Sequence, residues 1–193
     1  MMNLQKKILL LGCILALAGC ASTPTQYLTL SAQTSAPVPQ TLQAQGLPIL
    51  VAHVQMPADL DRMYFTTLQG QHRLDVANHV RWAAPLGGMA QKVLAQDLAS
   101  ELPEKNVLMP GDPLPHGPYL LVTVNIQSFL PSNDGQVLLR ADWFIQHMPD
   151  GHIQKQGRNQ FEQHHIAKSP EAQAAAMSRL LTRLSHVVAQ HLS

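Results

Sequence analysis

Cysteine and charge are both scarce in this sequence. Only Cys13 and Cys20 occur among 193 residues, and the four charged residue types make up 13%, about half of the usual share. The formal net charge is +1, so no charge excess points to nucleic acid or to a polybasic membrane surface. Aromatic residues reach only 5%, which disfavours a dedicated ligand pocket, whereas the 46% of hydrophobic residues suffices for a packed core.

The patterns of common catalytic and metal sites are also missing. The sequence has no G-x-S-x-G, no P-loop and no G-x-G-x-x-G. Its ten histidines include the adjacent pair His164 and His165, as well as His72 and His79, but no H-x-x-x-H or H-E-x-x-H spacing that would bring zinc ligands together. We interpret the histidines as scattered surface residues and expect no metal, no cofactor and no enzyme activity.

The N-terminal segment has the order of a secretory signal. Lys6 and Lys7 precede an apolar run over residues 8–18, which is shorter than the roughly 20 residues that a membrane-spanning helix needs. Leu17-Ala18-Gly19-Cys20 follows at once and is typical of a lipobox, the processing signal of bacterial lipoproteins. We therefore predict a signal peptide over residues 1–19 and lipid attachment at Cys20; the alternative is an ordinary signal peptide with a chance cysteine.

Processing at this site would explain the cysteine content. Cleavage removes Cys13, so Cys20 is the one cysteine of the mature chain, its sulfur carries lipid and no disulfide can form. Bacterial lipoproteins normally carry three acyl chains, which makes the attachment effectively permanent. Ala21 follows the cysteine, whereas Asp at this place commonly retains a lipoprotein in the inner membrane of Gram-negative bacteria. We expect an outer-membrane lipoprotein that faces the periplasm.

The mature chain divides into an N-terminal segment and a folded domain. Residues 20–46 comprise the lipidated end, a candidate first strand at residues 27–30 and a linker rich in Ser, Thr, Ala, Gln and Pro. Residues 47–193 form the predicted periplasmic domain. A flexible tether of about 20 residues would hold this domain roughly 25 Å from the membrane on average.

The first half of the domain is predicted as strands followed by a helix. Residues 48–54 are mostly apolar and indicate a central strand, while residues 63–68 and 72–76 flank a turn and indicate a hairpin. Pro85 opens a helix that ends before Pro103. Its apolar positions recur at spacings of three and four: Leu86, Met89, Ala90, Val93, Leu94, Leu98 and Leu102.

The second half is predicted as three strands and a final helix. Alternating residues over 120–127 and 136–145 indicate two strands, and residues 153–161 form a more polar strand that we place at a sheet edge. Ser169-Pro170-Glu171 is a strong helix start, and the following helix has one apolar face. The expected fold class is α/β of the α+β type, a mixed or antiparallel sheet with two main helices packed on one face.

Two short motifs are candidates for a partner surface or for a structural role. In Asp59-Leu60-Asp61-Arg62 an Asp–Arg pair could stabilise a turn, or the same residues could meet a partner. In Arg81-Trp82-Ala83-Ala84-Pro85-Leu86 the tryptophan precedes the helix, where such a residue is usually core or an entry staple, although an exposed one can anchor an interface. We favour the core for Trp82.

These motifs carry a family resemblance. Tyr27-Leu28-Thr29-Leu30 soon after Cys20, residues 49–54 followed by Met56-Pro57, and then the two motifs above occur in an order and spacing that resemble the ABC-type transport auxiliary lipoprotein family. The match is by residues up to about Leu102 and by the pattern of elements beyond it. Ala84 and Thr67 depart from the family, which often has an acid and an arginine there, so the resemblance implies no salt bridge between them.

The resemblance implies a role without catalysis in an MCE-type intermembrane lipid transport system. The lipoprotein would dock or steady a periplasmic conduit at the outer membrane, with a periplasmic MCE protein as partner and the bilayer as anchor; a homo-oligomer is compatible with that role. The resemblance also implies an α/β sandwich with helices on one side of a sheet. Two alternatives remain open: a module that binds lipid in its own cavity, and a lipoprotein activator of an envelope enzyme.

Overall fold

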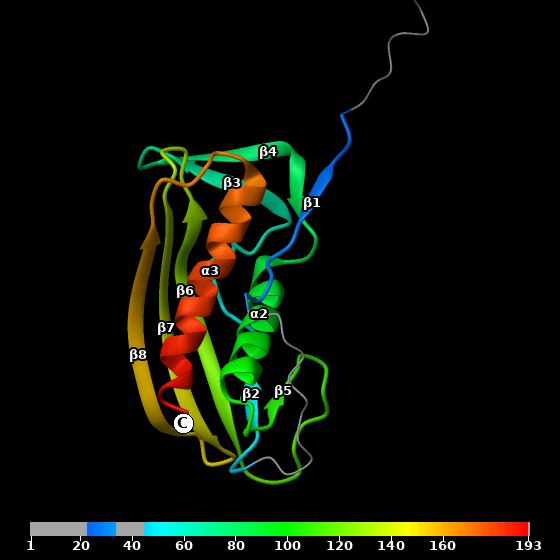
Figure 1. The fold of residues 1–193 in the computed structure, drawn as a ribbon, viewed down its shortest axis with the longest axis vertical. Coiled ribbons are helices and arrows are strands. Elements are labelled where there is room, and N and C mark those ends of the chain that lie inside the picture. The colour runs from blue at the N-terminus through cyan, green and yellow to red at the C-terminus, as the bar shows by residue number, and fades with distance from the viewer. Residues whose placement is uncertain (1–22, 34–44, 193) are drawn as a thin grey trace, which may run out of the picture.

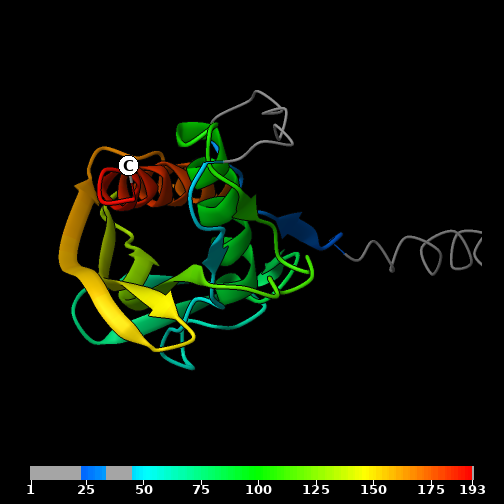
Figure 2. The same cartoon turned by 90° about the horizontal axis from the view of Figure 1, so that it is seen from below.

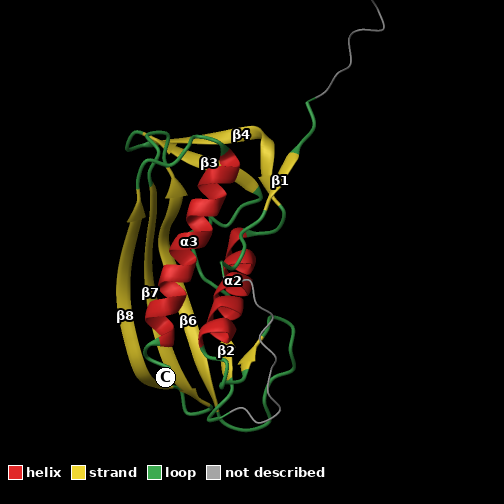
Figure 3. Cartoon of the chain, viewed as in Figure 1, coloured by secondary structure: helices red, strands yellow, loops and turns green. Residues whose placement is uncertain are grey.

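Two helices cover one face of a five-stranded sheet, and a three-stranded sheet lies across one end of this body (Figures 1 and 3). The computed structural model describes residues 23–33 and 45–192. The predicted signal peptide, Cys20 and most of the predicted linker lie outside the described residues. The α+β class expected from the sequence is confirmed, and both sheets are mixed.

The larger sheet has the strand order β5-β2-β6-β7-β8. Strand β2 (Ile49–Val51) runs parallel to β5 (Val107–Leu108) and to β6 (Tyr119–Pro131). Strands β6, β7 (Val137–Met148) and β8 (His152–Gln163) form an antiparallel meander. The central place expected for residues 48–54 and the edge place expected for the last strand are therefore confirmed.

Alternation along the strands sends one set of side chains into the core. The inward residues of β7 are all buried: Val137, Leu139, Ala141, Trp143 and Ile145. The edge strand leaves room for the largest of them, because a Cβ on Gly157 would lie 2.5 Å from the ring of Trp143. The indole N–H of Trp143 donates a hydrogen bond to Asn159 Oδ1 at 2.8 Å, so its one polar atom is satisfied.

Helices α2 (Leu86–Glu101) and α3 (Pro170–Ala189) lie side by side on the same face of the large sheet (Figure 2). The Ser169 hydroxyl accepts a hydrogen bond from the Ala172 N–H at the start of α3, which confirms the predicted cap. Every apolar position expected on α2 is buried. Between the helices, Thr182 Oγ1 donates to the fully buried carboxylate of Asp97 at 2.8 Å, so a polar contact adds to the apolar packing.

The smaller sheet has the order β1-β4-β3 and was not anticipated as a separate sheet. The hairpin of β3 (Tyr64–Gln69) and β4 (Arg73–Trp82) is antiparallel, and β1 (Gln26–Leu28) runs parallel to the end of β4. The third strand was expected to end at residue 76. It continues to Trp82, because its last residues pair with β1 rather than with β3 alone.

Pairing with β4 ties the N-terminal segment to the body. Leu28 and Leu30 are buried in the core, Leu28 O accepts a hydrogen bond from the Ala83 N–H at 2.8 Å, and the Ser31 N–H donates to Ser178 Oγ at 3.2 Å. Only residues 21–25 separate Cys20 from β1. The expected tether of about 20 residues is wrong, because most of those residues follow the point where the chain joins the fold.

Candidate functional site

The turn between β2 and β3 positions the first motif, which contains Asp61 and Arg62. Pro57 O accepts hydrogen bonds from the N–H groups of Leu60 and Asp61 at 2.9 and 3.1 Å, and Leu60 is buried. Asp61 and Arg62 do not form the expected ion pair with each other. Arg62 Nε donates instead to Ala58 O at 3.1 Å, so it stabilises the turn through the backbone.

Asp61 stabilises the N-terminus of α2. Its Oδ1 accepts a hydrogen bond from the Gly87 N–H at 2.9 Å. The residue at the N-cap, Pro85, makes no side-chain cap, so the carboxylate of Asp61 supplies an acceptor for one of the N–H groups that the first helical turn leaves unpaired. Its negative charge also interacts favourably with the positive end of the helix dipole. The two sequence motifs therefore meet at this helix start.

Gly87 permits this approach. A Cβ at Gly87 would lie 2.7 Å from Val54 O, closer than a real Cβ contact allows, and 3.4 Å from Asp61 Oδ1. The first turn of α2 thus packs against Val54, in the segment that follows β2, and against the turn that contains Asp61.

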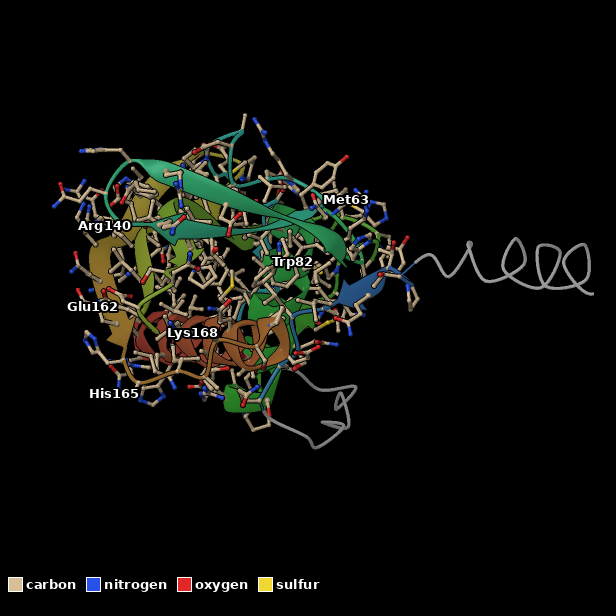
Figure 4. The ribbon with its side chains drawn as sticks, turned by 90° about the horizontal axis from the view of Figure 1, so that it is seen from above. Met63, Trp82, Arg140, Glu162, His165 and Lys168 are labelled. Carbon is tan, nitrogen blue, oxygen red and sulfur yellow. The ribbon has the colours of Figure 1, made fainter. Side chains whose placement is uncertain are left out.

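Trp82 belongs to the core, as favoured from the sequence. It is buried, and its ring centroid lies 5.3 Å from that of Phe65 in a tilted arrangement. Its backbone N–H donates to Met63 O at 2.7 Å. In the view onto this end of the molecule, Trp82 lies within the body and Met63 at its rim (Figure 4). Trp82 therefore joins the hairpin to the helix layer and does not anchor a partner directly.

Arg81 lies on the opposite side of β4 from Trp82. Its guanidinium stands over the ring of Tyr64, 4.2 Å from the ring centroid. The pKa of the Tyr64 phenol is lowered by hydrogen bonding to Arg81 and, second, by the positive charge of Arg81. Three of the five motif residues therefore lie at the junction between the small sheet and α2: Asp61, Trp82 and Pro85. Arg62 stabilises the neighbouring turn, and Arg81 lies on the outer surface of the small sheet.

The sequence reading missed three features of this end. The capping of Gly87 by Asp61 joins residues 26 positions apart, which no local pattern signals. The pairing of β1 with β4 is likewise signalled by no local sequence pattern. The exposed apolar residues Tyr27, Tyr64, Leu74 and Val76 were not singled out, although Leu74 and Val76 alternate with charged residues in a way that marks one face of a strand.

The spaces found around these elements are small or open. The cavity lined by Trp82, Leu86, Phe129 and Met177 has a volume of about 10 Å³, near the lower limit for one water molecule. A groove of about 310 Å³ lies open along the outer face of β7 and β8, between Asp142, Phe144 and Arg158. There Arg158 forms an ion pair with Asp142, 2.6 Å between Nε and Oδ1, which lowers the pKa of the Asp142 carboxyl.

The described part of the chain holds no cluster of three or more His, Cys, Asp or Glu side chains placed to bind a metal ion. No described helix is long and apolar enough to cross a bilayer.

The family model for the ABC-type transport auxiliary lipoprotein component matches residues 28–189, from β1 to the last residue of α3. The chain belongs to this family. It is the PqiC-like family, and the chain resembles its namesake, the intermembrane transport lipoprotein PqiC. The family match therefore begins at the last residue of β1 and takes in all later strands and both helices. A comparison with curated proteins found no match.

Solved structures share this fold. The crystal structure of an uncharacterized protein superposes with a TM-score of 0.73 at 19% identity, covering 89% of this chain and 100% of that chain. The crystal structure of protein XCC0632 from Xanthomonas campestris gives a TM-score of 0.64 at 13% identity, covering 84% of this chain and 92% of that chain. At these identities the likeness shows the fold alone. The family membership makes this chain a transport auxiliary lipoprotein of the cell envelope.

Proposed function

We propose that this protein is the outer-membrane-anchored lipoprotein component of an MCE-type intermembrane lipid transport system, and that it docks or steadies the periplasmic conduit at the outer membrane. It acts by contact, without catalysis. The observation that carries the proposal is the attachment of β1 to β4 in a fold of the transport auxiliary family. It brings the folded body within a few residues of the lipid-bearing Cys20.

An adaptor of this kind contacts the membrane at one end and the conduit at the other. The segment from Thr23 into β1 enters at the end where the small sheet lies, and the loop between β5 and β6 lies at the opposite end (Figure 1). That loop is rich in proline and carries the exposed Leu114. A conduit that arrives from the inner membrane would approach this second end, while the first end stays at the outer membrane.

A second candidate is a module that carries lipid in its own cavity. The cavities among the described residues give it little support, because sites for drug-sized ligands already occupy about 300–1,000 Å³ and a two-chain phospholipid is larger. The space lined by Trp82 is about 10 Å³, and the groove at Asp142, of about 310 Å³, is open to solvent and has Asp142, Gln156 and Arg158 in its lining. Mass spectrometry of the purified protein for co-purifying phospholipid separates this candidate from the adaptor.

The adaptor is tested by crosslinking in cells. A photoreactive amino acid is placed at Leu114, at the end away from the anchor, and a matched probe at Leu74, on the small sheet; both side chains are exposed. We expect Leu114 to crosslink to a periplasmic MCE protein and Leu74 not to. Recovery of a peptidoglycan synthase without any MCE protein would contradict the adaptor and favour the activator of an envelope enzyme.

A further inference from the structure

The small sheet has one face turned to the core and one turned to solvent. Leu28, Phe65 and Trp82 point inward and are buried. Four large aromatic or aliphatic side chains of this sheet are exposed: Tyr27, Tyr64, Leu74 and Val76, with Tyr27 exposed to 66%. The polar residues Asn78 and His79 of β4 are exposed as well. Met63 adds an exposed methionine at the rim of this end (Figure 4). A gathered apolar surface of this kind marks a site of contact.

The strand register places these residues on the same face. Arg81 is opposite both Tyr27 and Tyr64, and directly paired residues in a sheet project to the same side. On β3, Tyr64, Thr66 and Leu68 alternate on that side, and Thr66 and Leu68 pair with Val76 and Leu74. Thr66 itself is buried, so the exposed apolar side chains lie around it. We call this set the outer face: Tyr27, Tyr64, Leu68, Leu74, Val76 and Arg81.

The chemistry of the outer face suits the headgroup region of a bilayer. Tyrosine has an apolar ring and a polar hydroxyl, and it is enriched where a protein meets the membrane–water interface. Arg81 is the charged residue of the face; an arginine can bury its apolar stem while its guanidinium stays near phosphates. Here the stacking of Arg81 on Tyr64 holds the guanidinium at the surface.

The position of the lipid anchor indicates that a bilayer covers the outer face. From Cys20 to Gln26 are six residue steps, which span at most about 20 Å even when fully extended. Strand β1, where this segment ends, is itself part of the small sheet. A bilayer that holds the lipid on Cys20 is therefore always within reach of the outer face, at a high effective concentration.

We propose that the outer face rests on the lipid bilayer in which Cys20 is anchored, at the depth of the headgroups. The proposal rests on the lipid attachment that is part of the proposed function. This contact fixes the orientation of the folded body on the membrane. The lipid alone would leave the body free to rotate, whereas contact of the outer face with the bilayer keeps the β5–β6 loop directed away from the membrane.

The test uses the mature, lipidated protein in vesicles of phosphatidylethanolamine with a minority of phosphatidylglycerol. Because the sulfur of Cys20 is acylated, Leu74→Cys supplies a single thiol for a fluorescent probe. Ile153→Cys is the matched control: it is 44% exposed where Leu74 is 42% exposed, and it lies at the start of β8, at the other end of the molecule (Figure 1). Lipids that carry a spin label near the headgroup quench a probe only at short range.

We expect several-fold stronger quenching at Leu74 than at Ile153. Equal, weak quenching of the two probes in protein that floats with the vesicles would overturn the membrane contact and leave the anchor intact. A Leu74 probe that is shielded from aqueous iodide but not quenched by the lipid label would show that protein, such as a second copy of the chain, covers the face, and would also overturn it. If the wild-type protein does not float with the vesicles, it has no lipid anchor, and that result would contradict both the proposed function and this inference.

Discussion

Gly87 lies where the neighbouring backbone leaves no room for a side chain. A Cβ there would meet Val54 O at 2.7 Å, whereas at the neighbouring Gly88 it would meet nothing within 4 Å. We expect Gly87→Ala to lower the free energy of unfolding by about 1–3 kcal/mol, the usual cost of overpacking. Gly88→Ala is the control and should stabilise the protein by about 0.5–1 kcal/mol, since alanine favours a helix. Chemical denaturation measures both; equal midpoints would contradict the tight contact.

Asp61 is expected to contribute to stability through α2 although it lies outside the helix. Asp61→Ala removes the acceptor of the Gly87 N–H and should cost about 0.5–2 kcal/mol, the range for lost N-terminal caps. Asp59→Ala, an exposed change in the same turn, should alter the unfolding midpoint little. Thermal unfolding of the two variants compares them directly, and a larger effect at Asp59 would show that the carboxylate of Asp61 is not the one that caps α2.

At the scale of elements, helix α3 depends on burial of one face. Leu184 is fully buried in the core, so Leu184→Ala should cost about 2–5 kcal/mol. Leu114→Ala removes the same atoms from an exposed loop and should change stability by about 0.5 kcal/mol or less. Urea denaturation gives both values. An unchanged midpoint for Leu184→Ala would place this face of α3 outside the core.

The pairing of β1 with β4 is the element-level contact that matters most for function. Strand β1 has three residues, too few to form a stable hairpin or sheet alone, and it is held by the burial of Leu28 and Leu30. Because the predicted lipid-bearing Cys20 lies only six residues before Gln26, lipid attached there would hold the body at a defined point on its surface.

At the scale of the molecule, the anchor at Cys20 remains a prediction. Cys20→Ser should give an unprocessed or soluble periplasmic protein, because the lipobox needs the thiol for acylation. Cell fractionation and flotation distinguish the outcomes. A variant that is still cleaved at the same bond and still floats with membranes would rule out the lipobox.

Loss of the whole protein should weaken the outer membrane. We expect a deletion strain to become more sensitive to detergents, mildly so where parallel transport systems operate. The intact gene should restore resistance, whereas the Cys20→Ser form should not. Full rescue by the unanchored form would mean that the protein acts without its place at the membrane.

The sequence by itself determined the local elements and the family. The apolar stripes of both helices, the Ser169-Pro170 start of α3 and the alternation along β7 are periodic or capping signals that a few neighbouring residues carry, and each was found in the structure. The core position of Trp82 followed from the same reasoning.

Only the tertiary structure decided how the N-terminal end is assembled. Two contacts at this end join segments that are far apart in the sequence: the pairing of Gln26 with Val80 and the hydrogen bond from Gly87 to Asp61. The division of the strands into two sheets depends on such long-range pairing. A three-residue strand is too short to show a period, and a capping aspartate that lies 26 residues before the glycine it caps follows no spacing rule. Such contacts are selected by the packing of the whole core, because the free energy that stabilises them comes from the side chains they bury together.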